Sequence, residues 1–318
     1  MRFEVETTHP RIKILGLGEG GINLLKTFSR TPFSHLETIA LDNHPLTLSE
    51  LSTPLKILLP SHLEERRDLF PKRDLEPLLE DTEIGIIIAG LGGEVTGRFL
   101  LPLVREIKER EGLVIVVGIF PFYFEGKKKR LRAEELRREL SLQSDALLIF
   151  SNETFHRSYS HLPLNLFFEE VNARILDILL GIIEPLLTPS FLPLDLPTFR
   201  RIIEDGGEIV LGWGEERGEN RSFKVIDAII HESPWRKEKL RTIRRVLINV
   251  RGGEDLTMQE LSRISEAVTS RVSPEADIAV SAVIKESYHG EIRVTLMGIK
   301  SAKRARGISF LEERSSLC

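Results

Sequence analysis

Short apolar runs alternate with amphipathic stretches along the first half of the chain. The runs, most of them rich in β-branched residues, occupy positions 12–15, 37–41, 84–89, 113–119 and 145–150. Helical spacing of apolar residues follows the first run at Ile22, Leu25 and Phe28, and helical stretches also follow two of the later runs. Prolines leave the region 53–80 ambiguous. Strands that alternate with helices predict an α/β fold with a doubly wound parallel sheet.

The second half of the chain has a different pattern. A long helix is predicted over 166–187, and its apolar residues occupy more than one face, which indicates burial between two bodies. A strand at 246–250, a helix opened by the capping box Thr257–Glu260, and two further strands then predict a smaller α+β domain. The expected parts are 1–165, 166–187, 188–300 and a short tail, 301–318.

The charge balance and the single cysteine narrow the classes of partner and setting. The chain carries 44 Lys and Arg against 48 Asp and Glu in 318 residues, a net charge of −4, which argues against nucleic acid as a partner. The one cysteine, Cys318, excludes an internal disulfide framework and a zinc site built from cysteines, so a reducing, cytoplasmic setting is expected. No apolar stretch reaches the ~18–20 residues of a membrane span, and no signal sequence is visible.

Two glycine-rich turns carry the candidate chemistry. Gly16, Gly18 and Gly21 form a G-x-G-x-x-G pattern between the first strand and its helix, and a second turn at 90–97 follows the third strand. Glycines let the backbone approach a phosphate, and a helix N-terminus offers N–H groups and the positive end of its dipole. Two such turns at one edge of a sheet indicate two clamps on one polyphosphate, and a pair of tight turns without a ligand is the plain alternative.

Distinctive motifs follow one another from about residue 11 to residue 299. They are the first turn with Asn23, the segment 89–93 (AGLGG) with Thr96-Gly97, 121–128 (PFYFEGKK), 151–153 (SNE), 218–221 (GENR), 249–256 (NVRGGEDL) and 290–295 (GEIRVT). Together they resemble the FtsZ family, the bacterial and archaeal relatives of tubulin. The resemblance implies a tubulin/FtsZ-like fold with a Rossmann-like parallel-sheet nucleotide-binding domain, a central helix and a smaller C-terminal α+β domain.

The resemblance also implies roles for single residues in binding GTP or GDP. Phe168 matches the aromatic residue that stacks on the base, and Asn172 and Asn152 match polar contacts of the base. Glu125 matches the ribose ligand, and Lys129 stands where the family usually has a phosphate-side arginine. The remaining nucleotide-binding candidates lie in the two turns: Gly18, Gly20, Gly21, Asn23, Gly92, Gly93, Thr96 and Gly97. Taken singly, Phe168 fits a core aromatic equally well, and the asparagines fit ordinary turn or helix residues.

Departures from the family pattern lie at the phosphate loops. Glu19 and Ile22 replace glycines of the first loop, Glu94 and Val95 interrupt the second, and 53–80 has no counterpart of the family's third loop. Three interpretations of Glu94 stay open: it caps the helix that phosphate normally caps, it points into solvent, or it holds Mg²⁺. Magnesium is not expected as a cofactor, and no other metal site is expected.

Hydrolysis of GTP is expected to be weak or absent. In the family, acidic residues in a segment after the central helix act on the GTP of the next subunit, and Asp195 is the one such acid retained here. Thr198 replaces the acid that polarises the attacking water, and threonine is no general base near neutral pH. Asp195 is therefore the single candidate catalytic residue.

The expected function is that of an FtsZ-like cytoskeletal or cell-division protein that assembles head to tail or joins a partner FtsZ. An ordinary GTP-hydrolysing FtsZ and a nucleotide-free interaction protein with the FtsZ fold are the alternatives, and a Rossmann oxidoreductase that uses Asp42 on a ribose is a remote one. Residues 308–314 faintly resemble the terminal peptide through which FtsZ proteins bind a membrane anchor. A membrane-anchor protein is thus a further candidate partner, although a frayed tail is the plainer interpretation.

Overall fold

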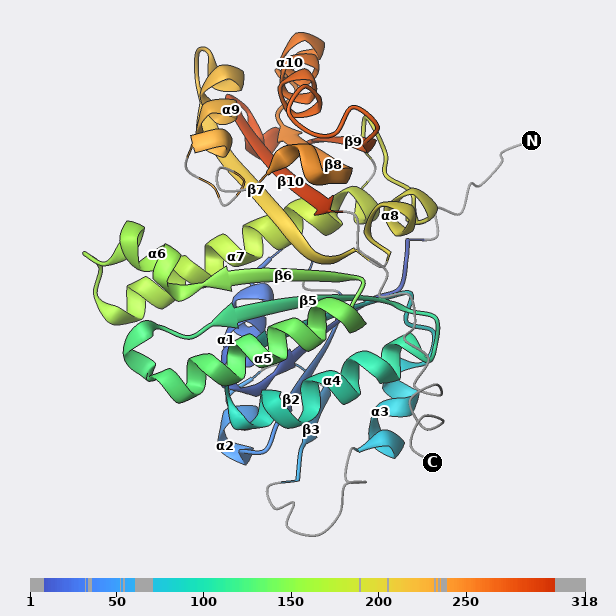
Figure 1. Cartoon of the computed structure of the whole chain (residues 1–318), viewed down its shortest axis with the longest axis vertical. Helices are drawn as coiled ribbons and strands as arrows, with labels where there is room; N and C mark the ends of the chain where they lie inside the picture. The colour runs from blue at the N-terminus through green and yellow to red at the C-terminus, as the bar shows by residue number, and fades with distance from the viewer. Residues whose placement is uncertain are drawn as a thin grey trace, which may run out of the picture.

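The computed structural model describes residues 9–300 apart from positions 32, 34, 35, 52, 54, 61–70, 189, 205, 232, 234 and 236–238. Within these residues, ten strands form one continuous sheet in the order β3-β2-β1-β4-β5-β6-β7-β10-β8-β9. Figure 1 shows two bodies on either side of the long helix α7, one built from the first half of the chain and one from its last third. The predicted α/β fold class is confirmed.

The elements have the following bounds. The strands are β1 (Ile12–Leu17), β2 (Glu37–Asp42), β3 (Leu55–Leu58), β4 (Ile84–Gly90), β5 (Leu113–Phe120), β6 (Ala146–Ser151), β7 (Gly207–Arg217), β8 (Ile243–Gly252), β9 (Asp277–Ile284) and β10 (Glu291–Lys300). The helices are α1 (Gly18–Phe28), α2 (Pro45–Ser49), α3 (Lys72–Leu79), α4 (Glu94–Lys108), α5 (Lys127–Gln143), α6 (Asn152–Tyr159), α7 (Leu164–Leu187), α8 (Leu196–Ile203), α9 (Arg221–His231) and α10 (Met258–Thr269).

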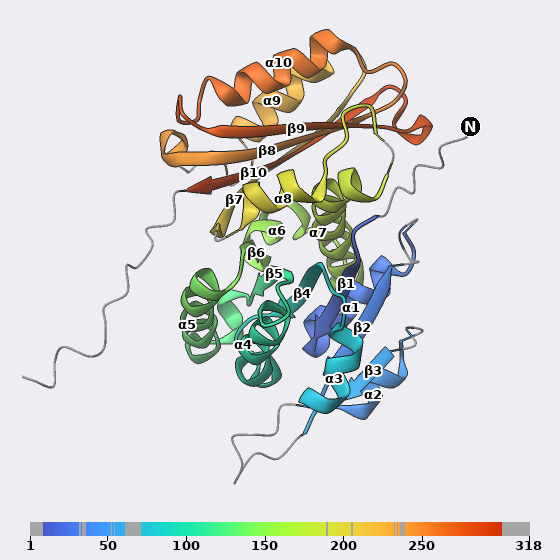
Figure 2. The same cartoon turned by 90° about the vertical axis from the view of Figure 1, so that its right-hand side faces the viewer.

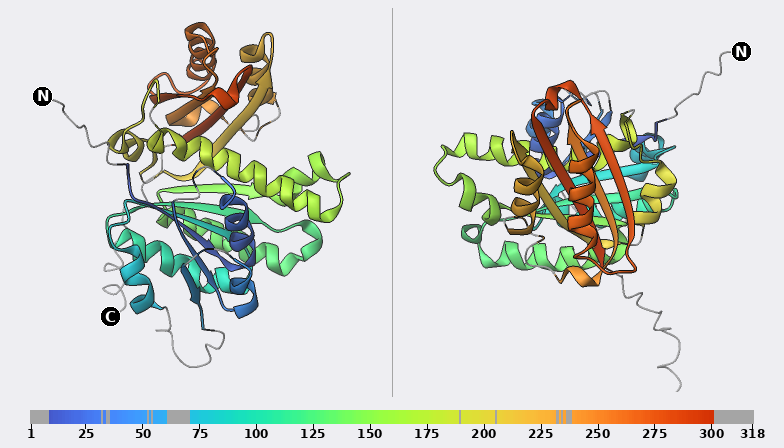
Figure 3. Two further views of the ribbon diagram at one scale, coloured as in Figure 1. Left: turned by 180° about the vertical axis from the view of Figure 1, so that it is seen from behind. Right: turned by 90° about the horizontal axis from the view of Figure 1, so that it is seen from above.

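The first body is a doubly wound parallel sheet in the strand order 3-2-1-4-5-6. Successive residues of a strand point to opposite faces. Ile14 and Ile88 accordingly pack with α1 and α7, whereas Leu15 and Ile87 pack with α4 and α5 on the other face. Figure 3 shows α1 on the face of the sheet opposite α4 and α5. Burial on both faces explains why these strands are continuously apolar in sequence.

The second body contains β7, β10, β8 and β9. β10 is antiparallel to β7 and β8, and β8 is parallel to β9. Val246 and Ile248 face a core beneath α9 and α10, whereas Leu247 and Met297 face the core shared with α7. Figure 2 shows α9 and α10 on the outer side of this part of the sheet and α7 on its inner side.

The two bodies share few main-chain hydrogen bonds. β6 and β7 pair only at Ala146↔Gly207 and Leu147↔Glu208, whereas β1 and β4 pair at six positions. The second body also packs on α7, whose 24 residues span ~36 Å at 1.5 Å per residue. α7 begins beside α6, at the carboxyl edge of the parallel strands, and ends near α8 (Figure 1).

Several elements differ from the sequence prediction. The region 53–80 holds the strand β3 and the helix α3, and the expected long helix begins at Leu164. β7, α8 and α9 had no individual prediction. The prolines at 54 and 189 and the tail 301–318, with Cys318, lie outside the described residues. Among the described residues, the helices include none that is both long and apolar enough to cross a membrane.

Candidate nucleotide-binding site

The two glycine-rich turns meet at the point where the strand order of the parallel sheet reverses. The turns follow β1 and β4, which are neighbours in the sheet, and ligands of doubly wound sheets bind outside the carboxyl ends of such strands. A Cβ atom on Gly20 would lie 3.3 Å from the backbone of Gly90, and one on Gly18 would lie 3.6 Å from the side chain of Thr96. The predicted pairing of the two turns at one edge is therefore present in the fold.

Gly21 allows α1 to pack tightly on the neighbouring strand. A Cβ atom on Gly21 would lie 2.1 Å from the carbonyl oxygen of Ile88, closer than any real contact. Gly18 has a φ of 70°, a left-handed conformation that favours glycine. The first turn thus holds the start of α1 directly against β4.

The N-termini of α1 and α4 carry no side-chain cap in the described residues. The N-cap residues are Leu17 for α1 and Gly93 for α4, and neither offers a side-chain acceptor. The hydroxyl of Thr96 donates to the carbonyl oxygens of Gly90 at 2.9 Å and Gly93 at 3.1 Å, so it stabilises its own turn. Two uncapped helix starts beside each other form an environment that favours an anion.

The second turn also contacts the start of α5. Gly92 has a φ of 86°, and a Cβ atom there would lie 2.4 Å from the carbonyl oxygen of Lys129. The ammonium of Lys129 pairs with the carboxylate of Glu125, which accepts a hydrogen bond from the backbone N–H of Phe122 at 2.7 Å. Two of the predicted site residues, Glu125 and Lys129, therefore lie next to the second turn and contact each other.

An aromatic cluster borders the same edge. Phe122 stacks on Phe124 with ring centroids 4.7 Å apart, and it meets Phe168 edge to face at 6.2 Å. Phe168 is 40% exposed and Phe124 is 78% exposed, so both offer a ring to a ligand or a partner. Tyr123, also exposed, packs under the guanidinium of Arg130 at 3.7 Å. The sequence motif predicted Phe168 as a candidate, but it assigned no role to Phe124 or Tyr123.

The polar candidates occupy neighbouring helices. Asn172 lies one turn after Phe168 on α7, Asn152 is the first residue of α6, and Asn23 lies on α1; all three are half-buried. Gly97 lies in the first turns of α4 in open space, with nothing within 4 Å of a Cβ atom built on it. All the predicted nucleotide-binding residues therefore come from elements at one end of the first body.

Glu94 does not cap the helix that it begins. Its side chain is 65% exposed, and its carboxylate pairs with Arg98 at 2.7 Å, one turn further along α4. The described residues hold no group of three or more His, Cys, Asp or Glu side chains arranged around a metal position. Of the three interpretations of Glu94, the structure favours the one in which the side chain points into solvent.

Asp195 lies apart from the glycine turns, beyond the far end of α7. It is the N-cap residue of α8, and its carboxylate accepts a hydrogen bond from the backbone N–H of Thr198 at 2.8 Å. Hydrogen bonds from the side chain and the backbone of Thr198 lower the pKa of Asp195. Within one chain Asp195 therefore caps a helix and cannot reach the site at the other end of α7.

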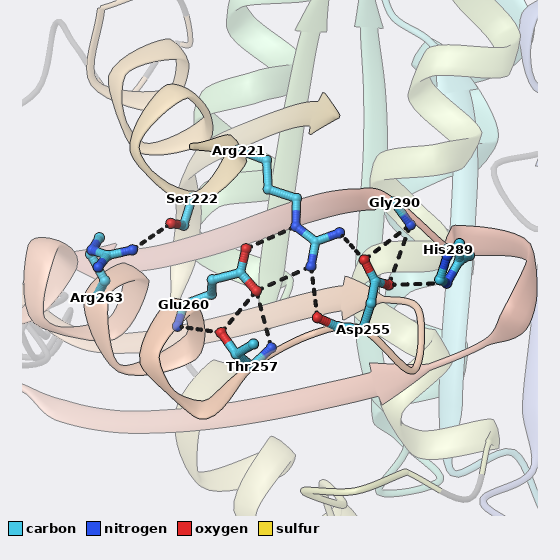
Figure 4. A network of polar contacts seen from close by, with 8 residues as sticks. All are labelled: Arg221, Ser222, Asp255, Thr257, Glu260, Arg263, His289 and Gly290. Atoms are coloured by element: carbon cyan, nitrogen blue, oxygen red, sulfur yellow. Dashed lines mark hydrogen bonds and ion pairs between the residues drawn. The ribbon is translucent and has the colours of Figure 1, made fainter. Parts of the chain in front are cut away.

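A second polar cluster, absent from the sequence predictions, lies in the second body (Figure 4). Arg221, at the start of α9, is buried and donates to Glu260 at 2.8 Å and to Asp255 at 2.5 Å. Asp255 also accepts from the backbone N–H of Gly290 at 3.2 Å, and Glu260 completes the predicted capping box with Thr257. The motifs 218–221 and 249–256 thus meet in one structural network, in which Arg221 of the first motif pairs with Asp255 of the second.

Comparisons with known proteins agree with this architecture. A family model described as the FtsZ family, C-terminal domain, matches residues 207–300. The chain is 28% identical over 310 residues to cell division protein FtsZ 2 of Halobacterium salinarum. The aligned region covers 92% of this chain and 78% of that protein. It is 27% identical over 301 residues to cell division protein FtsZ of Aquifex aeolicus, with 90% and 82% covered.

Solved structures show the same fold. An empty FtsZ dimer from M. jannaschii matches with a TM-score of 0.85 at 24% identity and covers 94% of this chain and 91% of its own. A GTPγS-bound protofilament of CetZ2 from Haloferax volcanii matches with a TM-score of 0.74 at 16% identity, with 92% and 95% covered. A GDP-bound CetZ1 monomer from the same organism also matches with a TM-score of 0.74, at 15% identity, with 92% and 96% covered.

Proposed function

This chain is an FtsZ-like protein of the tubulin/FtsZ family, and from that premise we propose that it is a cytoplasmic filament subunit with a guanine-nucleotide pocket and little or no GTP hydrolysis. Its curated relatives are named as cell division proteins, which supports a cytoskeletal role in division. The domain boundaries after residues 165, 187 and 300 stay predictions. A membrane-anchor protein as a partner of the tail also stays a prediction.

The observation that carries the proposal is the convergence of both glycine turns at the switch point of the sheet. A guanine nucleotide supplies an anionic phosphate chain and a flat base with a hydrogen-bonding edge. The uncapped starts of α1 and α4, with Lys129 beside them, suit the phosphates because they combine free backbone donors with positive charge. The carboxylate of Glu94 points outward to Arg98, and Glu19, the acidic residue in the first turn of α1, is exposed.

The exposed ring of Phe168 and the nearby amides suit the base. Phe168 offers a stacking face, and the side chains of Asn152 and Asn172 offer both donors and acceptors to a guanine edge. Glu125, already placed beside the second turn, is an acceptor for ribose hydroxyls.

Calorimetric titration of the purified chain with GDP tests the pocket. Phe168→Ala is expected to weaken GDP binding about tenfold or more, because stacking of a base on an aromatic ring contributes ~1–3 kcal/mol. Phe223→Ala, which removes an exposed ring from α9 in the other body, is the matched control and should leave GDP binding unchanged. A parent chain that binds no GDP, and releases no nucleotide when it is denatured, would instead identify a nucleotide-free protein with this fold.

Weak GTP hydrolysis is proposed because, within one chain, the candidate nucleotide site and the single candidate catalytic acid, Asp195, lie far apart. Asp195 lies past the far end of α7, so a neighbouring subunit would have to supply it, and Thr198 beside it provides no base. Thr198 is the third residue of α8, where an acidic side chain is favourable for the helix.

Thr198→Asp is therefore expected to fold normally and to raise GTP turnover above that of the parent. Phosphate release at high protein concentration with GTP and Mg²⁺ is the measurement. Asp195→Ala in the Thr198→Asp background is the control and should remove the gain. Robust turnover of the parent chain would favour the alternative of an ordinary GTP-hydrolysing FtsZ.

Head-to-tail assembly is proposed because the two ends of α7 carry different surfaces. The end with the glycine turns exposes Tyr123 and Phe124 next to Lys127 and Lys128, whereas the α8 end exposes Phe191, and Asp195 lies nearby with a lowered pKa that keeps it negatively charged. Two different surfaces at opposite ends of a subunit generate open filaments. The solved relatives include an FtsZ dimer from M. jannaschii and a CetZ2 protofilament from Haloferax volcanii, which supports assembly of subunits. Electron microscopy with and without GTP should show filaments, and Phe124→Asp should abolish them while the chain stays folded.

A further inference from the structure

The contact between the second body and α7 contains several charged side chains. Three residues of the helix, Arg174, Asp177 and Glu184, pair with four residues of the second body. Those four are Glu215, Arg251, Lys285 and Arg293. These seven residues are called the α7 ion-pair seam below.

Asp177 is the hub of the α7 ion-pair seam. Both oxygens of its carboxylate accept from the guanidinium of Arg251, with Nη1–Oδ1 at 2.9 Å and Nη2–Oδ2 at 3.1 Å. Arg293 adds a third bond to Oδ1 at 2.8 Å. Two parallel bonds between a guanidinium and a carboxylate fix orientation as well as distance.

The pairs reach every strand of the second body in turn. From one edge to the other, Glu215 of β7 meets Arg174 at 2.8 Å, Arg293 of β10 and Arg251 of β8 meet Asp177, and Lys285, just after β9, meets Glu184. Each strand is thereby held to a defined position along α7. A shift of the helix by one turn would break all of these pairs together.

The deepest members of the seam have no access to water. Arg251 and Glu184 are each 1% exposed, and the charge of Asp177 holds the guanidinium of Arg251 in its ionised form despite that burial. A buried charge without its partner is costly, because neither water nor protein then solvates it. Movement between the bodies would therefore be opposed by desolvation as well as by lost attraction.

Close packing at Gly181 reinforces this register. A Cβ atom on Gly181 would lie 2.1 Å from the hydroxyl oxygen of Thr295 and 3.2 Å from Nη2 of Arg251. The buried amide of Asn249 donates to the carbonyl oxygen of Gly181 at 2.7 Å. The sheet and the helix thus interlock between the two acidic positions of the seam.

We propose that the α7 ion-pair seam fixes the second body on α7 in a single arrangement. The Arg251–Asp177 pair is essential for this. Main-chain pairing alone cannot fix the orientation of the two bodies, because β6 and β7 pair at two positions only.

Distances between two spin labels, one on each body, test this proposal directly. Cysteines introduced by Glu139→Cys on α5 and Ser262→Cys on α10, both exposed positions, carry the labels in a Cys318→Ser background. The test variant combines Asp177→Ala with Arg251→Thr, which removes both charges of the central pair together. Arg293 then loses its bond to Asp177 but keeps its pairs with Glu215 and Glu291. The control combines Arg244→Thr with Glu275→Ala, an exposed pair within the second body whose atoms are 2.7 Å apart.

The parent and the control should give one narrow distance distribution, and the test variant should give one about twofold broader or split, as expected for a released domain. An unchanged width in a folded test variant would overturn the proposal. If circular dichroism shows that the test variant is unfolded, Asp177→Asn, which keeps the shape of the side chain, decides the question in the same way. Neither measurement needs nucleotide or assembly, so the result is independent of the proposed function.

Discussion

At the scale of single residues, Gly21 and Gly97 differ in what an added methyl group would meet. At Gly21 it would meet the carbonyl oxygen of Ile88 at 2.1 Å, and that oxygen belongs to a central strand that cannot move aside. At Gly97 it would meet nothing within 4 Å, at a position inside α4. Replacing each glycine by alanine therefore tests two different things. At Gly21 it tests whether the fold has room for a side chain, and at Gly97 it tests whether a ligand needs the space.

We expect Gly21→Ala to lower the free energy of unfolding by about 1–3 kcal/mol, because overpacking forces backbone shifts. Gly97→Ala should raise it by about 0.5–1 kcal/mol, because alanine is the better helix former. Urea unfolding followed by circular dichroism measures both. A loss of GDP binding in the stabilised Gly97→Ala variant would locate the ligand at the start of α4, and equal stability of the two variants would contradict the packing at Gly21.

A second residue-scale prediction concerns Asp195. Asp195→Ala removes the N-cap of α8 and should cost about 0.5–2 kcal/mol, whereas Asp195→Ser keeps an acceptor and should cost less. GDP binding should be unaffected by either change, since the residue lies past the far end of α7. If the two variants were equally stable by urea unfolding, the capping bond to Thr198 would not contribute.

At the scale of elements, apolar periodicity predicted the buried strands and missed the elements with mixed surroundings. β4 and β5 are buried on both faces, so their sequences are continuously apolar. β3 has one buried residue in four, and the second half of β7 is mostly polar and only partly buried, so neither carries a clear pattern. α8 has only eight residues and a proline in its first turn.

The candidate site was partly predictable for a related reason. Glycine turns and motif residues are local in sequence, and the fold brings them together at the switch point of the sheet. The side-chain pairings were not predictable, because Asp177 and Arg251 are 74 positions apart and nothing local marks them as partners. The outward direction of Glu94 likewise depends on its pair with Arg98, one turn along the helix.

The network around Arg221 gives an element-scale prediction. Arg221 joins α9 to Glu260 of α10 and to Asp255, and its removal would leave two carboxylates without their main partner. Arg221→Met should cost about 1.5–3 kcal/mol, a typical value for lost hydrogen bonds to charged groups, because the two carboxylates that lose their partner are only partly buried. Arg221→Lys should recover little of this loss, because lysine cannot form the forked contacts. Full stability of the lysine variant in urea would show that the geometry of the fork is unimportant.

At the scale of the whole molecule, two carboxyl groups at the contact between α7 and the second body, Asp177 and Glu215, both have a lowered pKa. Burial alone would raise the pKa of Asp177, but the charges of Arg251 and Arg293 outweigh it, so that the pKa is lowered. A hydrogen bond from Arg174 lowers the pKa of Glu215. A carboxyl whose pKa is lowered by folding stabilises the protein above its unfolded pKa, near 4, and this contribution is lost as the pH falls through the folded value.

We therefore expect the free energy of unfolding to fall steeply when the pH drops below about 4. Urea unfolding between pH 3 and pH 7 measures the dependence, and Asp177→Asn should make it shallower because one of the responsible carboxyls is gone. A chain that becomes more stable on acidification would contradict the lowered pKa values.

The two-position pairing of β6 with β7 has a mechanical consequence. A filament under tension transmits load through each subunit, and a sheet yields where the fewest backbone bonds share the force. In this chain the weakest line crosses the sheet between Ala146–Leu147 and Gly207–Glu208, while the six strands on one side stay intact. Stretching would thus separate β6 from β7 before it unfolded either body.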